Sequence, residues 1–195
     1  MKKTRFLLTG VGGQGTILAS NVLAELGISM GYDAKKAEVH GMSQRGGSVI
    51  SHVSWGEKVF SPVIPDGEAD ILISFEKLEA IRFVSGIRSG AMVLINDYEI
   101  VPITVSSGGG TYPSDEGIKA AFEPVTDKVY WVKGVAIAEE LGNVKAANVV
   151  LLGALSQILE MDAEPWLEVI EARVPPKFVE LNRKAFQAGR EAVKI

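Results

Sequence analysis

The sequence predicts an α/β protein with a Rossmann-like, doubly wound and mostly parallel sheet, a small antiparallel part and a helical C-terminal region. An apolar run over residues 5–9 leads into a glycine-rich turn and a helical segment. Short apolar runs flank a second amphipathic segment between residues 69 and 96, and helical periodicity dominates after residue 136. Strands that alternate with helices in this way are typical of a parallel sheet covered on its faces. A chain of 195 residues is expected to form one domain, residues 1–195.

The first third of the chain predicts two strands and a helix. Residues 5–9 are apolar enough for a buried strand, and residues 14–30 carry apolar side chains at helical spacing. We expect residues 32–39 to be the second parallel strand. Lys35 and Lys36 make that segment less apolar than such strands usually are.

The middle of the chain combines antiparallel and parallel signals. Residues 48–55 alternate in polarity, and Gly56 followed by residues 58–60 suggests a hairpin or meander. Residues 69–74 and 91–96 are short apolar runs on either side of an amphipathic stretch. They predict a parallel strand–helix–strand unit.

The last part of the chain is predicted to be a glycine-rich surface loop, one strand and several helices. The loop covers residues 106–113, and residues 128–132 form the strand. The expected helices cover residues 136–141, 146–159 and 165–172, and a last one begins at Pro175 and Pro176.

Composition excludes several classes of function. A formal net charge of -4 gives no broad basic surface for nucleic acid or an anionic membrane, so neither is expected as a partner. The N-terminal apolar run is too short for a signal peptide, and no later run reaches the length of a membrane span. We therefore expect a cytoplasmic protein.

The chain contains no cysteine and only two histidines, His40 and His52. The lack of cysteine excludes disulfides, thiolate nucleophiles and cysteine-ligated iron–sulfur clusters within the chain, and the small number of histidines disfavours a zinc site. No metal ligands and no catalytic side chains are assigned. Redox chemistry would need a cofactor held elsewhere.

The turn from Gly10 to Gly15 has the spacing G-x-G-x-x-G between a predicted strand and a predicted helix. Glycines at these positions let backbone N–H groups approach a phosphate at the start of the helix. Gly10, Gly12, Gly13, Gln14 and Gly15 are therefore candidate cofactor-binding residues. The alternative is that the glycines only allow the helix to pack closely on the sheet.

A dinucleotide site would also need an acidic residue near the end of the second strand, about 20 residues further on. Asp33 and Glu38 straddle that distance. Either could equally be a plain surface carboxylate, so NAD binding is possible but not favoured.

The loop that follows the second predicted strand is rich in polar groups and glycine. Its candidate binding residues are His40, Ser43, Gln44, Arg45 and Gly46. In a doubly wound sheet this loop should lie at the carboxyl edge beside the first glycine turn, where Arg45 could hold a phosphate or carboxylate. The alternative is a glycine-rich crossover in which Arg45 forms a surface ion pair and His40 caps a strand.

Other polar and aromatic residues are expected to be structural. There is no G-x-S-x-G motif for a serine nucleophile, and His52 alternates with apolar residues on a strand. Glu76 and Glu79 are interpreted as a solvated helix face. The three tryptophans are expected in the core or at an interface.

Taken together, the turn at residues 10–15 and the loop at residues 37–48 resemble the gamma domain or subunit of 2-oxoacid:ferredoxin oxidoreductases. The resemblance runs over nearly the full length, including residues 69–73 and 148–154, and is nearest to members that oxidise indolepyruvate or other arylpyruvates. The loop is its specific part.

The resemblance implies oxidative decarboxylation of a 2-oxoacid with coenzyme A to give an acyl-CoA, CO2 and reduced ferredoxin. It further implies that thiamine diphosphate and 4Fe-4S clusters sit on a larger partner subunit, that ferredoxin is reached through the complex, and that this chain binds no cofactor alone. The loop from His40 to Gly47 would contact coenzyme A or shape the substrate approach. A free-standing NAD-dependent dehydrogenase and a nucleotide-binding scaffold are the alternatives.

Overall fold

The computed structural model describes residues 3–40 and 46–194. Its centre is a six-stranded sheet in the order β2-β3-β1-β4-β5-β6. The strands are β1 (Thr4–Val11), β2 (Asp33–His40), β3 (Ser48–Gly56), β4 (Ala69–Ser74), β5 (Ile87–Asn96) and β6 (Val129–Val132). β1, β4, β5 and β6 are parallel neighbours, whereas β3 is antiparallel to both β1 and β2. The predicted mixed, mostly parallel α/β sheet is confirmed.

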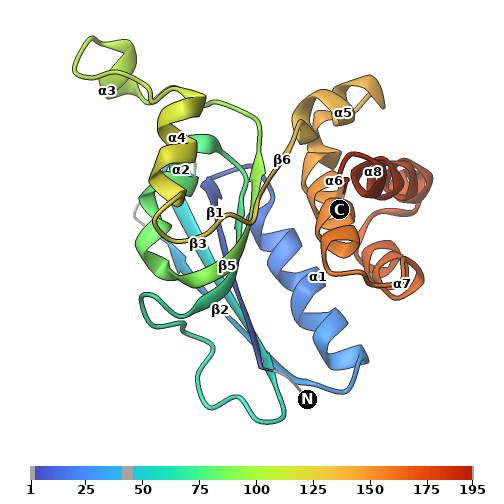
Figure 1. Cartoon of the computed structure of the whole chain (residues 1–195). Coiled ribbons are helices and arrows are strands. Elements are labelled where there is room, and N and C mark those ends of the chain that lie inside the picture. Colours follow the sequence, from blue (N-terminus) through green and yellow to red (C-terminus); the bar gives the residue numbers. More distant parts are fainter. Residues whose placement is uncertain (1–2, 41–45, 195) are drawn as a thin grey trace.

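Helices cover both faces of this sheet (Figure 1). One face carries α1 (Thr16–Ser29) with α5 (Gly134–Glu140), α6 (Ala147–Ile158), α7 (Glu164–Arg173) and α8 (Val179–Glu191). The other carries α2 (Lys77–Arg82) and α4 (Asp115–Phe122), while α3 (Ile103–Ser106) stands away from the sheet. Short 3-10 turns are η1 (Val84–Gly86), η2 (Val144–Ala146) and η3 (Pro176–Phe178).

Alternation along β1 divides the apolar side chains between two cores. Phe6 and Leu8 pack with the larger helical layer, and Leu7 packs on the opposite face with the layer of α2 and α4. All three are buried. This is the pattern expected of a central strand that is covered on both sides.

Two glycines let α6 and α8 approach more closely than side chains would allow. A Cβ on Gly153 would lie 2.0 Å from the carbonyl oxygen of Phe186, and one on Gly189 would lie 1.9 Å from that of Val150. α6 and α8 therefore pack closely against each other, and the C-terminal region is helical as predicted.

Two predicted pairings are wrong. β2 is not the second parallel strand beside β1, because β3 lies between them and is antiparallel to both. Residues 58–60 do not form a strand, since β3 pairs with the preceding β2 instead. In place of the expected hairpin, the Val59 N–H donates a 2.8 Å hydrogen bond to the Asp33 carboxylate at the start of β2.

Candidate functional site

The glycine turn joins the carboxyl end of β1 to the start of α1. Gly13 and Gly15 have φ values of 108° and 85°, which favour glycine. Gly15 is the N-cap of α1 and supplies no side-chain cap, so this helix keeps unsatisfied N–H donors at its start. A Cβ on Gly10 would lie 2.9 Å from the Cβ of Phe75, so this position also serves close packing.

Gln14 fastens the turn to the neighbouring strand. Its Oε1 accepts a 2.7 Å hydrogen bond from the Val11 N–H, and its Nε2 donates a 2.8 Å bond to the Phe75 carbonyl oxygen. Both ends of this candidate side chain are therefore engaged within the protein. The structure gives Gln14 a positioning role in the turn.

The end of the polar loop is hydrogen-bonded to this turn. The Gly12 N–H donates to the Gly47 carbonyl oxygen at 2.8 Å, and the Gly46 N–H lies 3.4 Å from the Gly12 carbonyl oxygen. The register places His40 opposite Val49 at the same edge of the sheet. Three other candidates, Ser43, Gln44 and Arg45, lie outside the described residues.

A cleft of about 580 Å³ opens between the glycine turn and the start of α6. It lies where the strand order reverses between β1 and β4, which is the usual ligand position in open α/β sheets. Its lining is mainly apolar, with Gly13, Gln14, Gly15, Leu18, Phe75, Asn96, Tyr98, Ile100, Val135, Val144, Lys145, Ala147 and Asn148.

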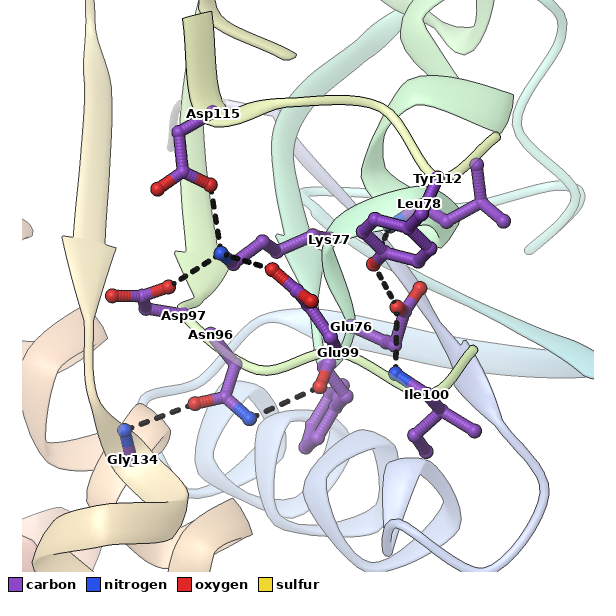
Figure 2. A network of polar contacts seen from close by, with 11 residues as sticks. Glu76, Lys77, Leu78, Asn96, Asp97, Glu99, Ile100, Tyr112, Asp115 and Gly134 are labelled. Atoms are coloured by element: carbon purple, nitrogen blue, oxygen red, sulfur yellow. Dashed lines mark hydrogen bonds and ion pairs between the residues drawn. The ribbon is translucent and has the colours of Figure 1, made fainter. Parts of the chain in front are cut away.

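Asn96 lines the cleft and joins two segments of the chain through its side-chain amide (Figure 2). Its Nδ2 donates a 3.0 Å hydrogen bond to the Phe75 carbonyl oxygen, and its Oδ1 accepts a 2.9 Å bond from the Gly134 N–H. Asn96 thus connects the end of β4 to the start of α5. Its place as the polar last residue of an apolar strand is the sequence signal that could have identified it.

The polar groups of the opposite wall are Lys145 and Asn148. Asn148 is buried, its amide packs against Gly15, and its Oδ1 has no hydrogen-bond partner within the described part of the chain. Lys145 is exposed at the edge of the cleft. An exposed ammonium and the free N–H groups at the start of α1, which line the same cleft, can together bind an anionic group. Sequence reasoning did not single out either residue.

The expectation that Glu76 and Glu79 form a solvated helix face is wrong. The two residues are only 1% and 3% exposed. The Glu79 carboxylate accepts a 2.5 Å hydrogen bond from the Ser48 hydroxyl and lies 3.2 Å from Arg82. Burial raises the pKa of Glu79. This buried carboxylate therefore holds the first residue of β3, directly after the polar loop.

The two carboxylates weighed for a dinucleotide site are not where such a site needs them. Asp33 pairs with Gly56 at the opposite end of the sheet from the glycine turn. Glu38 lies on β2, which β3 separates from β1, and forms an ion pair with Lys36 at 2.5 Å. The hypothesis of an NAD site therefore lacks the acidic residue that it requires.

His52 and the tryptophans have structural surroundings, as expected. The His52 Nδ1 accepts a 3.2 Å hydrogen bond from the Ile64 N–H, and burial lowers the pKa of this imidazole. Trp55 and Trp166 are buried in the core. Across residues 3–40 and 46–194, no cluster of three His, Asp or Glu side chains is arranged for a metal ion. In the same residues no helix is long and apolar enough to cross a membrane.

The sequence is similar to those of known proteins over its full length. The family model described as pyruvate ferredoxin/flavodoxin oxidoreductase matches residues 5–192. Indolepyruvate oxidoreductase subunit IorB of Pyrococcus horikoshii is 44% identical, over 100% of this chain and 98% of its own length. Indolepyruvate oxidoreductase subunit IorB of Thermococcus kodakarensis is 42% identical over the same shares.

Among solved structures, the chain is similar to the gamma subunit of a keto/oxoacid ferredoxin oxidoreductase from Geobacter sulfurreducens. The two share 25% identity and a TM-score of 0.75, with coverage of 98% of this chain and 97% of that one. The whole α/β architecture is therefore shared.

Proposed function

Because the chain belongs to the pyruvate ferredoxin/flavodoxin oxidoreductase family, we propose that it is the cofactor-poor subunit of an indolepyruvate or arylpyruvate:ferredoxin oxidoreductase. The complex would convert a 2-oxoacid and coenzyme A into an acyl-CoA and CO2, and its electrons would pass to ferredoxin. The observation that carries this proposal is the 44% identity over the full chain to an indolepyruvate oxidoreductase subunit.

The chemistry divides between this chain and a larger partner. Decarboxylation of a 2-oxoacid leaves a carbanion, which thiamine diphosphate can stabilise and ordinary side chains cannot. Delivery of single electrons to ferredoxin needs a redox centre, and this chain has no cysteine to ligate an iron–sulfur cluster. We therefore assign thiamine diphosphate and the 4Fe-4S clusters to a larger subunit.

The contribution of this chain would be to shape the approach of coenzyme A. The free N–H groups at the start of α1 and the Lys145 ammonium suit a phosphate. The unpartnered Oδ1 of Asn148 offers an acceptor for a ligand donor. The loop that carries His40, Ser43, Gln44, Arg45 and Gly46 would contact the same cosubstrate, since its Gly46–Gly47 end is bonded to the turn.

Purification of the tagged chain from its natural source, under native and anaerobic conditions, tests the proposal. We expect a larger chain to copurify and to contain thiamine diphosphate and iron–sulfur clusters. If the tightest partner contains neither, the proposal fails. Titration calorimetry of the isolated chain with NAD and with coenzyme A separates the proposal from a free-standing dehydrogenase, which requires tight NAD binding by this chain alone.

A further inference from the structure

Glu76 ties together the two ends of the long connection between β5 and α4. Its Oε1 accepts a 3.1 Å hydrogen bond from the Ile100 N–H before that excursion and another from the Tyr112 hydroxyl after it (Figure 2). Burial, followed by the bond to Glu76, raises the pKa of Tyr112, so its hydroxyl stays protonated as a donor. Residues 101–111 are thereby closed at their base.

Lys77 forms a second set of contacts across the same base, and we call the contacts of Glu76 and of Lys77 the two clasps. Its ammonium lies 2.9 Å from Asp97 and Glu99, before the excursion, and 2.7 Å from Asp115, after it. Burial acts to lower the pKa of Lys77, but the hydrogen bonds to these carboxylates outweigh it and raise the pKa. The ammonium therefore stays charged and holds both ends.

Residues 101–111, which we call the arm, project from this base without being buried themselves. None of them is buried, and α3 stands away from the sheet (Figure 1). The turn of α3 is closed by its own backbone, with the Ser106 N–H bonded to Pro102 at 3.0 Å and the Gly109 N–H bonded to Thr104 at 2.8 Å. The arm is a formed structural element on a fixed base.

The arm carries two exposed apolar side chains, and Asp97, Glu99 and Asp115 form an acidic collar around its base. Ile103 is 85% exposed and Val101 is 48% exposed. At the base, the side chains of Glu99 and Asp115 are about half exposed whereas that of Lys77 is nearly enclosed. Since one cation faces three carboxylates, the collar presents net negative charge to a partner.

The arm is continuous with the candidate site. Tyr98 and Ile100, at its root, line the cleft beside the glycine turn. A protein seated on the arm would therefore stand at the mouth of this cleft, where the partner that supplies the thiamine chemistry must face this chain. A second copy fits this position less well, because the whole chain carries a net charge of -4 and would bring like charge to an acidic collar.

We infer that the arm docks this chain onto the larger subunit, which receives Ile103 in an apolar recess with a basic rim. The inference rests on the proposed function and adds to it the surface used and the chemistry of the partner surface. Burial of the largely exposed Ile103, on an arm whose base is held beforehand by the contacts of Glu76 and Lys77, gives an anchor with little conformational cost on binding.

Ile103→Asp, measured against the purified larger subunit by titration calorimetry or surface binding, tests the inference. We expect affinity to fall on the order of thirtyfold or more, the size typical of an interface anchor. Phe60→Asp is the matched control, because Phe60 is 86% exposed but lies beyond β3 at the opposite end of the sheet. It should change affinity by less than about twofold, within the usual range for surface substitutions. Unchanged thermal unfolding of both variants establishes that each is folded.

The outcomes separate the two proposals. If the wild-type chain binds the larger subunit and Ile103→Asp binds it with the same affinity, the inference that the arm is the docking surface is wrong. The proposed function is unaffected by that result. If the wild-type chain does not bind a thiamine-bearing subunit at all, the proposed function fails. If Ile103→Asp instead converts a dimer of this chain into monomers, the arm serves self-association and the inference is wrong. Raising the salt concentration should weaken wild-type binding, because acidic and basic rims are screened.

Discussion

The Gly12 N–H donates a 2.8 Å hydrogen bond to the carbonyl oxygen of Gly47, so the turn after β1 and the end of the polar loop form one continuous backbone surface. Two segments that are more than thirty residues apart in the sequence therefore share one edge of the sheet. This places Gly46 and Gly47 beside the turn that leads into α1, and the start of a helix is a favourable position for an anionic group.

Gly15→Ala should destabilise the fold more than Gly13→Ala. Both glycines have positive φ, which costs an L-residue roughly 1–2 kcal/mol. A Cβ on Gly15 would also lie 2.3 Å from the Asn148 Nδ2, whereas one on Gly13 meets no atom within 4 Å. Crowding of this kind adds about 1–3 kcal/mol. Denaturant unfolding of both variants measures the difference. Equal losses of unfolding free energy would show that the Asn148 side chain moves aside without cost.

Lys77→Met should loosen both ends of the arm. The replacement removes the ammonium that holds Asp97, Glu99 and Asp115. We expect faster limited proteolysis within residues 101–111 and a loss of folding stability of roughly 1–2 kcal/mol. The loss is modest because the freed carboxylates can be hydrated. Lys36→Met, which removes an ion pair on β2, is the control. Cleavage of residues 101–111 at the same rate in both variants would contradict the role of Lys77 in holding the ends of the arm.

The Glu79→Gln variant should gain folding stability relative to the wild type as pH rises. Because burial raises the pKa of Glu79, the folded state binds this proton more tightly than the unfolded state does. Wild-type stability is therefore lost as pH rises from the ordinary carboxyl pKa of 4.5 through the raised value. Unfolding free energies at pH 4 and pH 7 test this, with Glu57→Gln as an exposed control. A difference that does not change with pH would disprove the burial of the charge.

Arg45→Ala and Lys145→Ala should each weaken the use of coenzyme A by the assembled complex. Loss of one charged donor to a phosphate costs on the order of 1.5–3 kcal/mol, or about ten- to a hundredfold in affinity. The readout is the KM for coenzyme A, with the KM for the 2-oxoacid unchanged. Lys184→Ala, a substitution on α8, is the control. If neither variant shifts the KM for coenzyme A, the anion site lies elsewhere.

The elements of the fold could be predicted from periodicity, but not all of their pairings. Residues 69–96 were correctly predicted as strand, helix and strand, because burial on both faces makes such strands apolar. Lys35 and Lys36 make β2 less apolar than a buried parallel strand, yet the segment was predicted to be the second parallel strand, and this was wrong. These lysines are typical of a sheet edge, where charge discourages further pairing. Which strand it joins depends on tertiary contacts that periodicity does not contain.

The site was only partly accessible from the sequence. The glycine turn was identifiable because its chemistry is local. Glu76 and Glu79 were assigned to solvent because carboxylates are rarely buried, whereas their burial depends on Tyr112 and Ser48, which are distant in the sequence. Asn148 likewise reaches the turn only through the packing of α6 against α1.

The central claim is that this chain supports oxidation of a 2-oxoacid only in complex with a larger, thiamine-bearing subunit. The most direct measurement follows reduction of a ferredoxin-like acceptor with indolepyruvate and coenzyme A, for each purified subunit alone and for their mixture. We predict no turnover by this chain alone and restoration of turnover in the mixture. Turnover by this chain alone, with thiamine and metals rigorously excluded, would contradict the account.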